Sequence, residues 1–87
     1  MKISFDDVAD RFENVLTGHF SRMDADRWAW QMVQADNSGS LQFIPAADRP
    51  RILRGLNYLL GIDLRSAPNT YLHTAEDIRH AYQHLKY

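Results

Sequence analysis

Three histidines and one aspartate near the C-terminus have a spacing that could bind a metal ion. His73, Asp77, His80 and His84 lie at positions i, i+4, i+7 and i+11, so they would share one face of a helix. His80 and His84 have the i, i+4 spacing through which two imidazoles can bind zinc. The stripe lacks the glutamate of a zinc-protease motif, and no third ligand is evident. We therefore interpret it as a polar outer face and expect no metal site and no cofactor.

A second candidate cation site is the polar segment at residues 36–41, which has part of the pattern of a calcium-binding loop. If Gly39 took loop position 6, Gln34 and Pro45 would stand at positions 1 and 12. Calcium needs an oxygen ligand at the first of these positions and a bidentate glutamate at the second. We interpret the segment as a turn.

The sequence carries no pattern that is typical of a catalytic site. No serine lies in a Gly-x-Ser-x-Gly elbow, cysteine is absent, and the four glycines are too scattered to form a phosphate-binding loop. Ser4 and Ser21 stand where helix caps are expected. We expect a protein that is not an enzyme and has no small-molecule substrate.

Four amphipathic helices would position these residues. The first is expected to begin after Ser4 and to stop at Gly18, and the second to run from Ser21 to about Gln34. The third is expected to use Asp48 as its N-cap, with Pro50 in its first turn, and to close at Gly61. The fourth opens with a capping-box pattern at Thr74 to Asp77.

Between the helices, Leu41 to Ile44 form an extended segment that is too short for a helix and would be a small strand. We predict an all-α fold for a single domain of residues 1–87. It is a compact, irregular bundle of about four helices, with one short extended segment near residues 41–44.

The aromatic residues divide between the core and the surface. Trp28 and Ile78 fall on apolar stripes, and Tyr71 and Leu72 would pack on the first turn of the last helix. Trp30 follows Trp28 by two residues, about 200° around a helix, so both indoles cannot enter one narrow stripe. Trp30 and Tyr58 lie off the main stripes of their helices and are the candidates for exposed aromatic contacts.

Composition and charge limit the class of protein. The chain has 87 residues, 45% of them hydrophobic and 24% charged, which is typical of one small globular domain. It has no apolar run of the roughly 20 residues that a membrane span needs, and its N-terminus turns acidic too early for a secretion signal. We expect a cytoplasmic protein without a membrane partner.

The net charge of −1 hides an uneven distribution. Residues 1–48 carry eight acidic and four basic residues, whereas residues 49–87 carry three acidic and six basic ones. Asp6, Asp10 and Glu13 would form an acidic ridge on the first helix. Arg49, Arg51 and Arg54 could serve a helix-turn-helix reader of DNA, but the acidic half would repel phosphates, so we favour no direct contact with nucleic acid.

Two segments of the second half form a recognisable pattern: Leu59 to Leu64 with Pro68, and Tyr71 to Ile78, with weaker support from Asp26 to Ala29. This pattern resembles small bacterial immunity proteins, the antidotes of polymorphic toxins in contact-dependent growth inhibition and colicin-like systems. The resemblance implies a protein that neutralises a cognate toxin domain by surface and charge complementarity. The toxin would be basic, with a nuclease acting in the cytosol as the leading choice.

Exposure arguments select the residues that would bind such a toxin. They are Asp6, Asp10, Glu13, Asp24, Asp26, Trp30 and Tyr58. The alternative is a small helical regulatory or DNA-associated protein that acts as a dimer through the face of Arg51, Arg54 and Tyr58. A complex with a toxin would support the first hypothesis, and a salt-sensitive mobility shift of duplex DNA would support the second.

Overall fold

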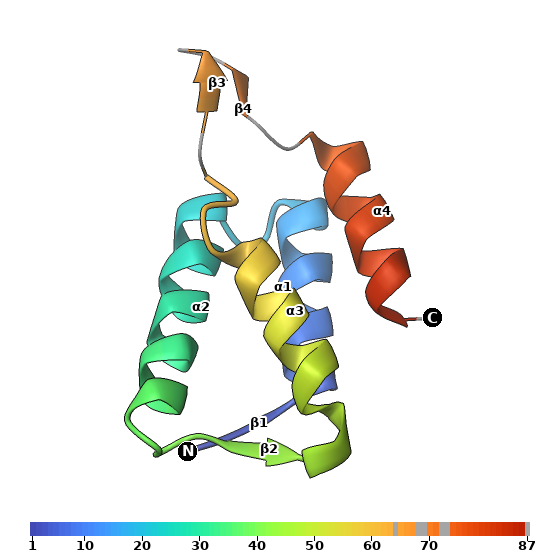
Figure 1. The fold of residues 1–87 in the computed structure, drawn as a ribbon. Coiled ribbons are helices and arrows are strands. Elements are labelled where there is room, and N and C mark those ends of the chain that lie inside the picture. The colour runs from blue at the N-terminus through green and yellow to red at the C-terminus, as the bar shows by residue number, and fades with distance from the viewer. Residues whose placement is uncertain (64, 68–69, 72–73, 87) are drawn as a thin grey trace.

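A computed structural model describes residues 1–63, 65–67, 70–71 and 74–86 (Figure 1). Over these residues the chain is mostly helical, with four α-helices, which confirms the predicted all-α bundle. The elements in chain order are β1 (Lys2–Ser4), α1 (Phe5–Thr17), α2 (Arg22–Asn37), β2 (Gln42–Ile44), a 3₁₀ turn η1 (Ala46–Asp48), α3 (Arg49–Leu59), β3 (Arg65–Ala67), β4 (Thr70–Tyr71) and α4 (Ala75–Lys86). Among the described helices, none is long and apolar enough to cross a membrane.

Capping boxes start two of the helices where the sequence predicts them. At α1, the Asp7 N–H donates to Ser4 Oγ at 3.4 Å, and the Ser4 N–H donates to Asp7 Oδ2 at 2.9 Å. Thr74 and Asp77 exchange the same two hydrogen bonds at α4, at 3.1 and 3.0 Å. Each box satisfies backbone donors that have no partner within the helix. Gly18 ends α1 with a φ of 81°, a conformation that favours glycine.

The other two helices differ in detail from the prediction. Ser21 caps α2 as expected, but the helix continues to Asn37, past the predicted end at Gln34. Asp48 lies in the 3₁₀ turn, so its backbone is already helical and its side chain does not cap α3. Its Oδ2 instead accepts a hydrogen bond from Arg51 Nη2 at 3.1 Å. Asp48 is therefore the N-cap residue of α3 by position, as predicted, but its side chain makes no capping hydrogen bond.

A two-stranded parallel sheet joins the N-terminus to the connection between α2 and α3. β2 is the extended segment predicted near residues 41–44, and its partner is β1, which the sequence analysis did not predict. Ile3 pairs with Phe43, and their side chains are only 1% and 9% exposed. The Gln42 N–H also donates to the Met1 carbonyl at 2.8 Å. A second, antiparallel pair, β3 and β4, lies in the segment before α4.

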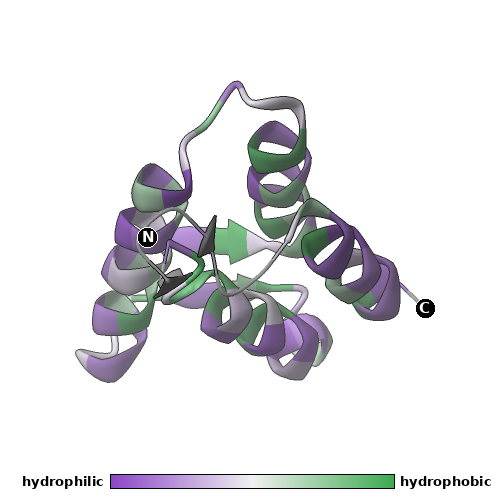
Figure 2. Ribbon diagram, turned by 90° about the horizontal axis from the view of Figure 1, so that it is seen from above, coloured by the Kyte–Doolittle hydropathy of each residue, from purple (hydrophilic) through white to green (hydrophobic). Residues whose placement is uncertain are grey.

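The core lies where α1 and α3 cross, with α2 packed on one side of α3 and α4 on the other (Figure 1). Apolar residues of the helices face this centre (Figure 2). Gly55 of α3 allows the crossing, because a Cβ atom there would lie 2.5 Å from Val8 Cγ1 of α1. The buried residues are Ile3, Val8, Phe12, Ala25, Ala29, Met32, Phe43, Ile52, Leu56, Leu59, Ile62, Ile78, Tyr82 and Leu85.

The two tryptophans behave as predicted. Trp28 is half-buried and packs on the core, and the guanidinium of Arg11 lies 4.8 Å from its ring and 5.0 Å from the ring of Phe20. Trp30 is 57% exposed. The core position predicted for Ile78 is confirmed. The predicted packing of Tyr71 and Leu72 concerns side chains outside those that the structure describes.

Candidate nucleic-acid interface

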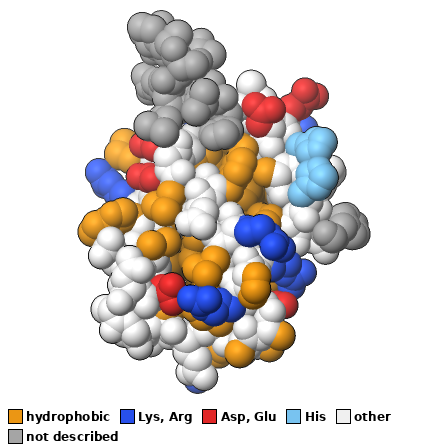
Figure 3. All heavy atoms as spheres, in the orientation of Figure 1, with side chains coloured by type: hydrophobic (Ala, Val, Ile, Leu, Met, Phe, Trp, Pro, Cys, Tyr) orange, Lys and Arg blue, Asp and Glu red, His pale blue; other side chains and the backbone are white. Residues whose placement is uncertain are grey.

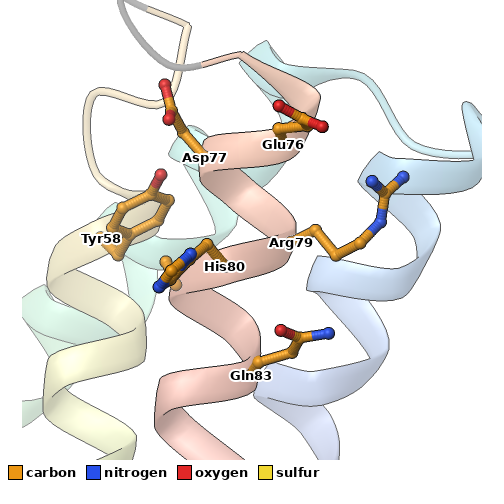
Figure 4. Close-up of a pocket in the computed structure, with 7 residues that line it drawn as sticks. Tyr58, Glu76, Asp77, Arg79, His80 and Gln83 are labelled. Carbon is orange, nitrogen blue, oxygen red and sulfur yellow. The ribbon is translucent and has the colours of Figure 1, made fainter.

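A groove runs along the seam between α3 and α4. Its lower part is a hollow of about 460 Å³ lined by Arg54, Asn57, Tyr58, Ala81, His84 and Leu85. Its upper part is lined by Tyr58, Glu76, Asp77, Arg79, His80, Ala81 and Gln83, and Asp77 lies above the Tyr58 hydroxyl (Figure 4). We call the residues that line these two hollows the α3–α4 groove.

Helix periodicity explains why polar residues line the groove. On α4, Ile78, Tyr82 and Leu85 are buried against the rest of the bundle. His80 and His84 are four residues apart and therefore project from one side of the helix, next to the buried stripe. On α3, Arg54 and Asn57 are exposed on the side opposite to Ile52 and Leu56, which are buried. Arginines over α3 and histidines over α4 consequently face the same side of the molecule (Figure 3).

The three arginines of α3 differ in their surroundings. Arg49 Nη2 lies 3.7 Å from Asp36 Oδ2, and Arg51 Nη2 lies 3.1 Å from Asp48 Oδ2. The guanidinium carbon of Arg51 also lies 3.9 Å from the centre of the Phe5 ring. Arg54 is exposed and makes no ion pair with any residue in the described part of the chain. Its charge is thus not offset by an ion pair, which leaves the guanidinium able to bind an external anion.

Tyr58 forms the floor of the groove and is not the free aromatic side chain that the sequence analysis expected. It is half-buried, and its ring stacks on Phe12 of α1 with the ring centroids 5.7 Å apart. Burial raises the pKa of the Tyr58 hydroxyl above its ordinary value, and the Asp77 carboxylate raises it further, while Arg22 opposes the shift. The apolar stripe of α3 does not include Tyr58, but α1 and α4 together cover it.

The raised pKa predicts a loss of stability in alkali. Above the ordinary tyrosine pKa of 10.0, the unfolded chain loses the Tyr58 proton while the folded chain still holds it, so the free energy of unfolding falls as the pH rises. Urea unfolding at about pH 8 and about pH 11 measures this fall. Tyr58→Phe keeps the ring and should lose less stability between the two pH values. Some loss should remain in Tyr58→Phe, because burial also raises the pKa of Tyr82, which both proteins retain. An equal loss in both proteins would contradict the prediction.

The histidines of the groove contact each other. His80 Nε2 and His84 Nε2 lie 2.8 Å apart, and the ring centroids are 4.6 Å apart. One ring must donate and the other accept, because a neutral imidazole has one N–H and one lone pair. Both side chains are exposed.

The acidic ridge predicted on α1 lies off the face that packs on α3. Asp6, Asp10 and Glu13 are exposed, as expected. At about 100° per residue, they project roughly 140° to 200° from Val8, the residue that faces Gly55 of α3. The ridge therefore projects away from the contact of α1 with α3, although Glu13 reaches α4, where burial and the Glu13 carboxylate both raise the pKa of the Tyr82 hydroxyl.

The remaining predicted contact residues lie on α2. Asp24 and Trp30 are exposed, whereas Asp26 is half-buried. Its Oδ1 accepts a hydrogen bond from the Gly61 N–H at 2.7 Å, which joins α2 to the end of α3. The seven predicted residues are thus spread over three helices, α1, α2 and α3. Sequence reasoning missed Asn57, and it treated His80 and His84 only as possible metal ligands or a polar face.

The fold and the groove define a small helical protein with a groove lined by hydrogen-bonding side chains and by Arg54, which has no ion pair among the described residues. The family model described as "YxzC DNA-binding protein" matches residues 4–84, and the chain belongs to this family. A Bacillus subtilis (strain 168) relative named "Uncharacterized protein YxzC" is 32% identical over 69 residues, which cover 79% of this chain and 51% of the relative. The chain thus spans about half the length of that relative. No solved structure matches.

The family match overturns the interpretation as an immunity protein with a toxin partner and no contact with nucleic acid. The two sequence segments that suggested an immunity protein have a local explanation, because they contain helix ends. Gly61, with a φ of 79°, follows the end of α3, and Thr74 and Asp77 form the capping box of α4. Such helix ends occur in unrelated helical proteins and carry no information on partners. The DNA-associated alternative is the better supported of the two hypotheses, and its dimer stays a prediction.

Proposed function

We propose that this chain binds duplex DNA through the α3–α4 groove and catalyses no reaction. The observation that carries the proposal is Arg54, an exposed arginine without an ion-pair partner among the described residues, in a chain that belongs to a family described as DNA-binding. An arginine can bind a phosphate with two parallel hydrogen bonds. Asn57, His80 and His84 would add hydrogen bonds to phosphates or to base edges. The binding would take place in the cytoplasm, which agrees with the localisation expected from the sequence.

The charge distribution supports this surface over the others. The net charge of −1 provides no general attraction to DNA, so binding must rely on a local group of cations and donors. Among the described residues that line the lower part of the groove, Arg54 is basic and none is acidic. Glu76 and Asp77 line the upper hollow, together with Arg79. We therefore expect the phosphate backbone to follow the lower part, with few contacts and a shallow dependence on salt.

Charge reversal at Arg54 tests the proposal. Arg54→Glu should weaken binding to a fluorescent DNA duplex by about tenfold at low salt, because it removes one phosphate contact and adds a repulsive carboxylate. The slope of log K against log salt should fall by about one unit. Fluorescence anisotropy over a range of sodium chloride concentrations gives both values.

Arg27→Glu is the matched control. Arg27 is exposed on α2, on the opposite side of α3 from α4 (Figure 1), and its reversal changes the net charge by the same amount. The control should bind nearly as well as the unaltered protein. Equal weakening by both variants would show that the groove is not the DNA surface. Absence of any salt-sensitive binding to duplex DNA would overturn the DNA-binding function itself.

A further inference from the structure

The contact between His80 and His84 of α4 places two potential metal-binding nitrogens side by side. The two exposed imidazoles present their Nε2 atoms to each other at 2.8 Å, from positions one helical turn apart. Their spacing in the sequence favours a polar outer face without a metal site; from their contact we propose instead that they form a two-histidine binding site for a divalent transition-metal ion, with Cu²⁺ and Ni²⁺ as the ions that fit best. The proposal does not depend on DNA binding.

The distance between the nitrogens is compatible with two bonds to one ion. With metal–nitrogen bonds of about 2.0–2.1 Å, two nitrogens 2.8 Å apart subtend an angle of about 90° at the metal. This angle suits neighbouring positions of the tetragonal geometry that Cu²⁺ and Ni²⁺ prefer. Tetrahedral Zn²⁺ needs a separation of about 3.3 Å and would require the rings to move apart. Imidazole nitrogen suits both favoured ions, and Cu²⁺ gives the highest affinity in the divalent series.

Metal binding would replace the hydrogen bond between the rings. Without a metal, one Nε2 carries the hydrogen that the other accepts. The ion needs a lone pair on both Nε2 atoms, so the donor ring must shift to the tautomer with its hydrogen on Nδ1. The side chains are exposed, and water can therefore exchange this proton and fill the remaining coordination positions. Two metal–nitrogen bonds form, and two water ligands leave the hydrated ion.

The surrounding charges nearly balance for a cation. Glu76 and Asp77 line the same hollow as His80 and attract a positive ion, whereas Arg79 in that hollow and Arg54 in the hollow of His84 repel it. Asp77 is not counted as a ligand, because its Oδ2 already accepts the Thr74 N–H at 3.0 Å. In the described part of the chain, no three histidine, aspartate or glutamate side chains are arranged to hold one ion. We therefore expect a site with two protein ligands, which is weaker than a structural zinc site.

Titration of nickel chloride into the tag-free protein, without DNA, tests the site. Calorimetry should show about one ion bound per chain. His80→Gln and His84→Gln should each weaken binding by about tenfold or more, because the loss of one imidazole removes the chelate. Nickel should also raise the thermal midpoint of the unaltered protein more than that of either variant, since a ligand that binds the folded state stabilises it.

His19→Gln is the matched control, because His19 lies outside α4 and its Nδ1 is 2.8 Å from Thr17 Oγ1. It should bind nickel as the unaltered protein does. Equal binding by His80→Gln, His84→Gln and His19→Gln, or no binding at millimolar nickel, would overturn the proposal. Arg54→Glu should keep or increase its nickel affinity, so failure of the metal site and failure of DNA binding would be seen separately.

Discussion

Replacing Phe12 by alanine should lower the free energy of unfolding by about 3–5 kcal/mol, the range measured for large aromatic residues in protein cores. Phe12 is fully buried in α1. Its ring stacks on Tyr58 of α3 at 5.7 Å and on Tyr82 of α4 at 5.4 Å, so it fills the space where three helices meet. Alanine would leave a cavity that rigid helices cannot close.

This loss would be a large part of the total stability, which is about 5–15 kcal/mol for ordinary domains. Urea unfolding followed by circular dichroism gives the value. Trp30→Ala is the matched control for a large aromatic residue, because Trp30 is 57% exposed and should cost far less. A loss below about 1 kcal/mol for Phe12→Ala would show that α1, α3 and α4 do not pack as described. The variant should also disturb the α3–α4 groove, since Phe12 supports Tyr58 at its floor.

Gly55→Ala should destabilise the protein, although helix propensity alone predicts a gain of about 1 kcal/mol. The added Cβ would lie 2.5 Å from Val8 Cγ1 and 3.4 Å from Leu85 Cδ1. The branched Val8 side chain has little freedom to turn away, and overpacking of this kind costs about 1–3 kcal/mol. The expected net result is a loss of up to about 2 kcal/mol in urea unfolding.

Two further variants make this result specific. Asn57→Ala, at an exposed position of the same helix, should change stability by less than about 0.5 kcal/mol. Val8→Ala removes the atom that the new Cβ would meet. The loss of unfolding free energy in the double variant Gly55→Ala/Val8→Ala should therefore be smaller than the sum of the two single losses, by about 0.5 kcal/mol or more. Additive effects, or a stabilising Gly55→Ala, would mean that α1 and α3 do not cross at this glycine.

The sequence by itself determined the four helices and most of their ends. Ser4 with Asp7, and Thr74 with Asp77, satisfy backbone donors within three residues along the chain, so local composition is enough to predict them. Trp30 was predicted to be exposed for an equally local reason, the angle of about 100° per residue between helical side chains. At Asp48 the predicted N-cap position is confirmed, but a 3₁₀ turn precedes the helix and the side chain makes no capping hydrogen bond.

Only the tertiary structure decided which surfaces come together. The pairing of Ile3 with Phe43, the hydrogen bond of Asp26 to the Gly61 N–H and the approach of Val8 to Gly55 all join residues far apart in sequence. None of them leaves a periodic pattern. The same holds for function. The sequence divides the chain into an acidic half and a basic half. In the folded chain, however, the acidic ridge of α1 lies away from the contact with α3, and Arg54 of α3 lies beside His84 of α4. The charge of a surface depends on which faces of the helices lie next to one another, and long-range packing determines how each helix is oriented about its axis.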